Sequence, residues 1–293
     1  MKESYLYKQA GDYVQCQTCC HYCRIAPFKR GICGVRENQK GKLFLLVYNQ
    51  VITENIDPIE KKPLFHFLPG TETLSIATIG CNFRCDWCQN WDISQAPKDL
   101  DRDEVMNKIG FEITPEKIVD DAIKHNCPSI SYTYTEPTIF LELALDTMKI
   151  AKEKGLKNIW VSNGYFSPET LDLIAPYLDA INIDLKGISS ENYLKYSGAK
   201  LQPVLDNIKE VFKRKSHLEV TTLIIPGIND SDKELTQIAN FLAGISKNLP
   251  WHISRFFPAY KLHDTEITPL DTLEKAEKIG KNASLKHIHL GNI

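Results

Sequence analysis

The sequence predicts an α/β fold in which a parallel sheet is closed or partly closed into a (β/α) barrel, preceded by a small cysteine-rich segment. From residue 74 onward, short runs of branched apolar residues alternate with longer segments typical of helices. This alternation indicates right-handed βα units and a parallel sheet. The predicted strands cover residues 74–79, 129–134, 157–162, 180–185, 217–225, 251–257 and 286–290. The predicted helices begin at Thr114-Pro115-Glu116 and then cover residues 138–154, 168–177, 202–214, 231–245 and 268–281.

The amino-terminal part has a different pattern. Residues 42–70 are typical of a small β section, with a strand at 43–48, a shorter one near 51–52 and a loop at 61–67. Turn-forming Pro69-Gly70 ends this section. We therefore predict two parts, a cysteine-rich segment with a small β section at residues 1–70 and the barrel at residues 71–293.

Composition and charge exclude several classes of function. Lys and Arg total 35 and Asp and Glu total 37, so the chain lacks the excess of positive charge that non-specific nucleic-acid binding requires. The sequence has no run of about 18 apolar residues, so we expect no membrane-spanning helix. The polar start predicts no signal peptide, and nine cysteines in such a chain are expected to be reduced metal ligands in the cytoplasm.

Three cysteines lie close together in one loop. Cys81, Cys85 and Cys88 follow the predicted strand 74–79, and Gly80 allows the turn into the loop. Active sites of such barrels lie at the carboxyl ends of the strands. Three thiolates can bind three corners of a cubane iron–sulfur cluster and leave one iron open to a small molecule. The alternatives are a zinc site with a distant fourth ligand or three unrelated buried cysteines.

A second group of cysteines lies near the amino terminus. Cys16, Cys19, Cys23 and Cys33 supply four thiols in a short segment with few apolar residues. A bound metal would provide the missing folding free energy, on the order of 10 kcal/mol for structural zinc. Zinc and an auxiliary iron–sulfur cluster both suit thiolate ligands. The adjacent Cys20 and His21 leave the ligand set open, and a segment of reduced thiols without metal is the alternative.

Polar residues also follow the next two predicted strands. Glu136 comes after strand 129–134, and Ser162 and Asn163 end strand 157–162. Because the carboxyl ends of parallel strands meet at one edge of the sheet, these residues are candidates for a binding site. The alternatives are an ordinary glutamate at a helix start and an ordinary Ser-Asn-Gly turn.

Two later strands carry further candidates. Asp184 and Lys186 alternate with apolar residues, so both face one side of strand 180–185 and its extension. A buried structural ion pair is the alternative for them. His252 and Arg255 lie on opposite faces of strand 251–257. A hydrogen-bonded core histidine is the alternative for His252.

The motifs resemble a known family. CxxxCxxC with Trp87 before its last cysteine resembles the signature of radical S-adenosylmethionine (SAM) enzymes. Cys16-x2-Cys19-x3-Cys23, Gly-Ile-Cys33-Gly-Val-Arg, Tyr-Thr-Tyr-Thr-Glu136-Pro, Asn-Ile-Asp184-Leu-Lys and Trp251-His252-x2-Arg255 resemble the AmmeMemoRadiSam-system radical SAM enzymes, relatives of pyruvate formate-lyase activating enzyme. The sequence departs from that family where Cys20 replaces a usual proline, and it ends before the cysteine-containing tail of longer members.

This resemblance implies a fold, cofactors and a reaction. The fold would be the partial TIM-like barrel of radical SAM enzymes, with Cys81, Cys85 and Cys88 binding a 4Fe–4S cluster. The residues implied at the SAM pocket are Trp87, Glu136, Ser162, Asn163, Asp184, Lys186, His252 and Arg255. A flavodoxin or ferredoxin would reduce the cluster, and the resulting 5′-deoxyadenosyl radical would abstract a hydrogen atom from a glycine of a partner glycyl radical enzyme. Modification of a small molecule or RNA is an alternative, and a metal-binding module without catalysis is another.

Overall fold

The computed structural model describes residues 1–107 and 110–293, and their contacts group them into two compact units. The first unit comprises Met1–Asn82 and Asn90–Ala180, and the second comprises Phe83–Gln89 and Ile181–Ile293. Both units contain parallel strands joined by helices, so the predicted α/β class is confirmed. The boundary predicted at residue 70 stays a prediction.

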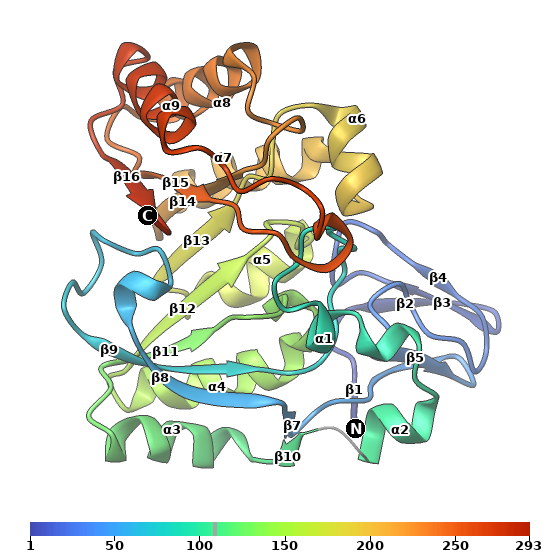
Figure 1. Ribbon diagram of the computed structural model, residues 1–293. Coiled ribbons are helices and arrows are strands. Elements are labelled where there is room, and N and C mark those ends of the chain that lie inside the picture. The colour runs from blue at the N-terminus through green and yellow to red at the C-terminus, as the bar shows by residue number, and fades with distance from the viewer. Residues whose placement is uncertain (108–109) are drawn as a thin grey trace. The chain divides into compact units, whose positions relative to one another are not determined.

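The first unit is built around a mostly parallel group of strands (Figure 1). Its strands are β8 (Thr53–Pro58), β9 (Glu72–Ala77), β11 (Ser129–Tyr132) and β12 (Lys157–Ser162). Strands β9, β11 and β12 are parallel, and β8 pairs antiparallel with β9 at the edge. Its three longest helices are α3 (Pro115–Lys124), α4 (Leu141–Glu153) and α5 (Pro168–Ile174), of which α3 and α4 pack against the strands.

Local sequence explains where these helices begin. Thr114 caps α3, because its side-chain oxygen accepts a hydrogen bond from the Lys117 amide at 3.3 Å, and Pro115 occupies the first helical position. Ser167 caps α5 in the same way through the Thr170 amide at 3.1 Å. The helix start predicted at Thr114-Pro115 is therefore confirmed.

The amino-terminal segment forms small antiparallel sheets within the same unit. One contains β2 (Tyr7–Ala10), β3 (Tyr13–Cys16) and β4 (Arg24–Ile25), and another contains β1 (Lys2–Glu3), β6 (Lys42–Leu45) and β5 (Arg36–Gln39). A two-stranded pair joins β7 (Gln50–Val51) to β10 (Phe111–Glu112). Val14, Cys16, Ile25 and Leu43 form a small buried cluster beneath these strands. The apolar core here is small, as the composition predicts.

The second unit contains the remaining strands and helices of the alternating pattern (Figure 1). Its strands are β13 (Ala180–Asp184), β14 (His217–Ile224), β15 (Trp251–Arg255) and β16 (Ile288–Gly291). Its long helices are α7 (Leu201–Lys213), α8 (Asp232–Ile245) and α9 (Leu270–Asn282). Strands β14, β15 and β16 are parallel, and α7 and α9 pack on them.

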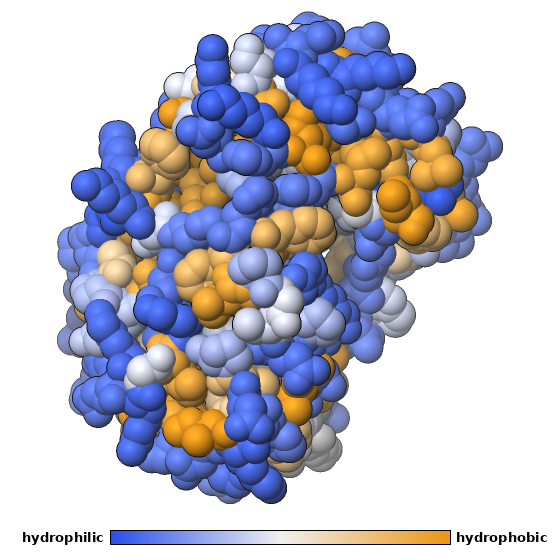
Figure 2. All heavy atoms as spheres, turned by 90° about the vertical axis from the view of Figure 1, so that its left-hand side faces the viewer, coloured by the Kyte–Doolittle hydropathy of each residue, from blue (hydrophilic) through white to orange (hydrophobic). Residues whose placement is uncertain are grey.

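Short helices occupy the connections. They are η1 (Ile59–Lys61), α1 (Trp91–Ser94), η2 (Ala96–Lys98), α2 (Arg102–Asn107), η3 (Pro137–Phe140), α6 (Ser190–Asn192), η4 (Tyr193–Ser197) and η5 (Tyr260–Leu262). No helix in the described part of the chain is long and apolar enough to cross a membrane. On the face drawn in Figure 2, hydrophobic residues form separate groups among hydrophilic ones.

Candidate functional site

The central cysteine loop, residues 81–88, begins at a glycine that no other residue could easily replace. Gly80 follows β9 and has a φ of +103°. A Cβ atom added there would lie 3.0 Å from the Cys33 carbonyl oxygen and 3.0 Å from Val35 Cγ1. Glycine therefore lets the chain turn towards Cys81 while the amino-terminal segment packs closely against the turn.

Glu136, Ser162 and Asn163, which the sequence places at the ends of two strands, lie together in the structure. The Ser162 hydroxyl donates to Glu136 Oε1 at 2.9 Å, and the Asn163 amide donates to Glu136 Oε2 at 2.8 Å. The Thr138 amide donates to Oε1 at 3.1 Å. Burial raises the pKa of Glu136, although hydrogen bonds from Thr138, Asn163 and Ser162 oppose the shift. This buried carboxylate joins the ends of β11 and β12.

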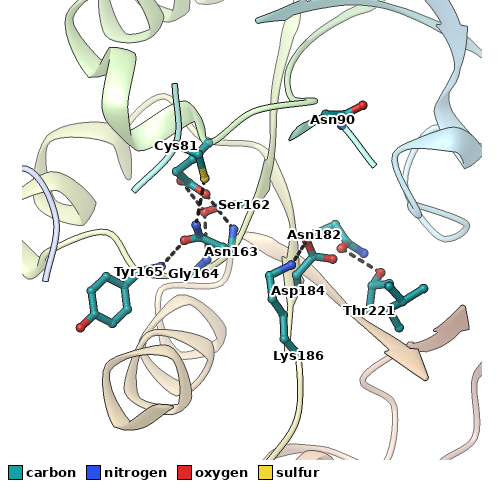
Figure 3. Close-up of polar contacts among 12 residues, drawn as sticks. Cys81, Asn90, Ser162, Asn163, Gly164, Tyr165, Asn182, Asp184, Lys186 and Thr221 are labelled. Carbon is teal, nitrogen blue, oxygen red and sulfur yellow. Dashed lines mark hydrogen bonds and ion pairs between the residues drawn. The ribbon is translucent and has the colours of Figure 1, made fainter. Parts of the chain in front are cut away.

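The same network reaches the central cysteine loop (Figure 3). Asn163 Nδ2 donates to Asn82 Oδ1 at 2.7 Å and lies 4.0 Å from Cys81 Sγ. Asn163 Oδ1 accepts the Tyr165 amide at 3.0 Å, which fixes the orientation of the side-chain amide. One polar network therefore connects Glu136 to the residue that follows Cys81.

The second unit positions Cys85 and Cys88. The Arg84 and Asp86 amides donate to the carbonyls of Ser197 and Tyr196 at 2.9 and 3.0 Å, which attaches residues 83–89 to η4. The Cys88 amide donates to the Cys85 carbonyl at 3.1 Å and forms a tight turn. Trp87 is buried, and its ring lies 6.4 Å from that of Tyr196.

Asp184 and Lys186 face the same side, as their alternation predicts (Figure 3). Lys186 Nζ lies 3.0 Å from Asp184 Oδ2. Burial opposes the charge of Lys186, but Asp184 and Cys85 outweigh it and hold the pKa of Lys186 above its usual range. Burial raises the pKa of Cys85 to about 11, and the Lys186 ammonium opposes this rise. The positive charge of Lys186 therefore lies near Cys85, where it offsets the cost of burying a thiolate.

His252 and Arg255 contact protein groups in the second unit. His252 Nε2 lies 2.6 Å from Oε2 of Glu219, a fully buried carboxylate that also contacts His217 Nε2 at 2.9 Å. This arrangement matches the alternative of a hydrogen-bonded core histidine. Arg255 Nε donates to the Thr268 carbonyl at 2.7 Å. Contacts of His252 and Arg255 with a cofactor or substrate stay predictions.

Sequence reasoning missed a polar cluster of Asp57, Lys62 and Tyr134, in which the two charged residues are buried. Lys62 is 1% exposed. Its Nζ donates to Asp57 Oδ2 at 2.6 Å and lies 4.5 Å from the centre of the Tyr134 ring. The Tyr134 hydroxyl also donates to Asp57. Tyr134 has a φ of +61°, a conformation that favours glycine. No local sequence pattern indicates this cluster, because its members come from separate parts of the chain.

The predicted metal ligands are present but are not arranged around an ion. Cys16, Cys19, Cys23 and Cys33 line one cavity in the first unit. Within residues 1–107 and 110–293, no group of three or more His, Cys, Asp or Glu side chains has the arrangement of a metal site. Binding at either group of cysteines would therefore require its side chains to move towards the metal.

Comparisons with known proteins identify the family of this chain. The profile of the Radical SAM superfamily matches residues 75–242. An uncharacterized protein of Methanocaldococcus jannaschii is 44% identical over 295 residues, covering 100% of this chain and 86% of that protein. The pyruvate formate-lyase-activating enzyme of Clostridium pasteurianum is 23% identical over 224 residues, covering 72% and 90%.

A solved structure supports the fold. Streptococcus suis SuiB bound to S-adenosylmethionine superposes with a TM-score of 0.55 at 11% identity, covering 75% of this chain and 52% of that one. At this identity the likeness concerns the fold alone. The family profile spans more than half of the chain and includes all three cysteines of the central loop. The chain belongs to the radical SAM superfamily.

Proposed function

We propose that this chain is an AmmeMemoRadiSam-type radical SAM enzyme that abstracts a hydrogen atom from a glycine of a partner glycyl radical enzyme. Its similarity to a pyruvate formate-lyase-activating enzyme over 72% of its length carries this proposal. The Asp184-Leu185-Lys186 triplet and the network around Glu136 support it.

Radical SAM enzymes use a 4Fe–4S cluster and SAM, and the donor set of this chain suits that cluster. Cys81, Cys85 and Cys88 offer three soft thiolate ligands within eight residues, and a three-cysteine set leaves one iron for SAM. Lys186 places a positive charge near Cys85, which favours its thiolate. Held by these three cysteines, the cluster would supply the chemistry of reductive SAM cleavage.

The protein residues bind and orient the cofactor. Glu136 already accepts hydrogen bonds from Thr138, Ser162 and Asn163, so we assign it a positioning role at the end of β12. Asp184 is 38% exposed at its side chain and can meet an ammonium or hydroxyl group of SAM. Contacts to SAM from Trp87, Ser162, Asn163, Lys186, His252 and Arg255 complete the proposed pocket. We propose cytoplasmic function with a flavodoxin or ferredoxin as electron donor.

The first experiment tests for radical SAM chemistry. The protein is reconstituted anaerobically with iron and sulfide and is then mixed with SAM and dithionite. We expect 5′-deoxyadenosine and methionine in equal amounts, measured by liquid chromatography and mass spectrometry. Cys85→Ala provides the control without product. An intact cluster that gives no 5′-deoxyadenosine would leave the alternative of a metal-binding module without catalysis.

A second experiment tests the partner class. Pyruvate formate-lyase serves as the probe protein, and electron paramagnetic resonance detects the doublet of a glycyl radical. A probe variant with alanine in place of the radical glycine should give no doublet. Hydrogen abstraction from RNA or a small molecule, in a reaction without any partner protein, contradicts the activating-enzyme assignment.

A further inference from the structure

The amino-terminal cysteines lie at one small, partly open cavity in the first unit. Cys16, Cys19, Cys23 and Cys33 line a cavity of about 20 Å³. Asn82, which follows Cys81 in the chain, and Arg36 line the same cavity. These four cysteines come from a stretch of 18 residues that includes three loop positions and the end of β3. The fold therefore places four cysteines of one short segment on the wall of one cavity.

Two buried hydrogen-bond donors on this cavity lack an acceptor. Arg36 and Asn82 are 2% and 1% exposed. In the part of the chain that the structure describes, Arg36 Nε and Asn82 Nδ2 make no hydrogen bond. Leaving a buried donor unpaired is costly, so such donors indicate a missing partner. Metal-bound thiolate sulfurs are anionic acceptors of N–H groups and supply such a partner.

Neighbouring residues narrow the ligand set. The Cys20 thiol donates to the Phe166 carbonyl at 3.2 Å, and Cys20 is not among the residues that line the cavity. His21 lines the cavity, but its Nε2 lies 2.9 Å from the Asn82 carbonyl oxygen and is engaged there. Four cysteines remain as a complete tetrahedral donor set.

The size of the cavity and the number of thiols bear on the kind of thiolate centre. As it stands, the cavity has room for little more than one water molecule, which needs about 10–15 Å³ of such space. Four thiolates also complete the tetrahedral ligand set of a structural zinc site, which favours a single ion. We propose that Cys16, Cys19, Cys23 and Cys33 bind one Zn²⁺ in a closed structural site. Because the sulfurs are not yet gathered around a point, binding requires rotation of the cysteine side chains about χ1.

This site has a structural consequence for the radical SAM loop. The Cys33 carbonyl packs where a Gly80 side chain would be, and His21 contacts the Asn82 carbonyl. The Thr170 hydroxyl of α5 donates to the Thr18 carbonyl at 2.7 Å and anchors the segment between Cys16 and Cys19. A zinc ion that fixes these cysteines would therefore also fix the start of the central cysteine loop.

The test measures metal in a variant that lacks the central thiols, Cys81→Ala/Cys85→Ala/Cys88→Ala, so that its result does not depend on the proposed radical reaction. We expect one zinc and no iron per chain by mass spectrometry. X-ray absorption should show four sulfur neighbours at about 2.3 Å. Iron with sulfide, a nitrogen neighbour at the zinc, or absence of bound metal would overturn the proposal.

Matched variants on the same background identify the ligands. Cys20→Ser should keep the zinc, and Cys33→Ser should lose most of it. Because Cys33→Ser could fail to fold, a second measurement uses the full-length triple variant with all of its amino-terminal cysteines unchanged. After removal of metal by a chelator, added Co²⁺ should give the intense visible bands of tetrahedral thiolate coordination. The weak spectrum of octahedral Co²⁺ contradicts the proposed site.

Discussion

The two groups of cysteines differ in how the chain surrounds them. The four amino-terminal cysteines line a small cavity together with two buried unpaired donors, Arg36 Nε and Asn82 Nδ2. The three central cysteines occupy one loop, and the part from Arg84 to Cys88 is fixed by backbone hydrogen bonds. Four ligands complete a tetrahedral metal site, whereas three leave a position for a substrate. The same ligand chemistry can therefore serve structure in one region and catalysis in the other.

The cations beside the two groups differ in the same way. Arg36 makes two hydrogen bonds to Glu142, at 2.9 and 2.7 Å, and both side chains are almost fully buried. Lys186 pairs with Asp184 at 3.0 Å, but the Asp184 side chain is 38% exposed. A buried pair holds a fixed arrangement, whereas a partly exposed carboxylate can exchange its partner for a ligand. This difference agrees with a closed site near Arg36 and an open site near Lys186.

The largest expected effect comes from Cys85→Ser. This change removes one of three cluster ligands, so we expect loss of the radical SAM iron and of 5′-deoxyadenosine formation to background. The proposed zinc should remain, because it has a separate set of ligands. Metal analysis and product chromatography check both expectations. Cys127→Ser, at a buried cysteine outside both groups, is the control and should retain iron and activity.

Cys33→Ser in the otherwise unaltered chain should mainly affect stability. Structural zinc provides on the order of 10 kcal/mol in small domains, and loss of one ligand removes a large part of it. We expect a lower melting temperature and weaker retention of iron in the central loop, measured by calorimetry and metal analysis. Cys20→Ser should leave both unchanged. Equal destabilisation by both variants would contradict the distinction between them.

Breaking the buried pair of Arg36 and Glu142 tests whether Arg36 depends on its carboxylate partner more strongly than Lys186 does. Glu142→Gln leaves the Arg36 charge without its anionic partner, which costs about 3–5 kcal/mol for a buried pair. Asp184→Asn should cost less than Glu142→Gln, because the Asp184 side chain is 38% exposed and solvent partly screens the pair. Urea unfolding measures both changes. Similar costs for the two variants would remove the basis for calling one site closed and the other open.

Sequence patterns predicted the elements well where local rules dominate. Strand β12 covers Lys157–Ser162, as predicted, because apolar alternation and flanking turns agree there. Strand β11 ends two residues before the prediction, near Tyr134 with its positive φ. The helix predicted at 138–154 divides into η3 and α4, and the Glu136 side chain caps the Thr138 amide at the start of η3.

Site residues were predictable when they followed strands and not when they depended on distant pairing. Glu136, Ser162 and Asn163 come together because parallel strands end at a common edge. The pair of Arg36 and Glu142 joins residues 106 positions apart, and no local pattern indicates it. The network between Asn163 and Asn82 also depends on tertiary contacts. Local sequence therefore identifies candidate polar groups, whereas tertiary packing determines which of them contact one another.

A third buried cation, Lys62, extends the comparison to a pair outside both cysteine groups. Burial raises the pKa of its partner Asp57, but hydrogen bonds from two lysines and Tyr134 outweigh burial and hold that pKa well below its usual range. A carboxyl group with a depressed pKa stabilises the folded state above its unfolded pKa, near 3.9. That contribution is lost as the pH falls through the folded-state pKa.

Asp57→Asn should therefore reduce stability at neutral pH by about 1–3 kcal/mol, since Lys62 keeps only a neutral acceptor. The difference in melting temperature between the two proteins should be constant from pH 7 to pH 5 and should shrink below about pH 4. Lys61→Ala, which alters the exposed partner of Asp57, should change stability by less than about 1 kcal/mol. A difference in melting temperature that grows on acidification would show that Asp57 does not act as an ionised partner of Lys62. Burial of a carboxylate would then not predict how much it contributes to the stability of this fold.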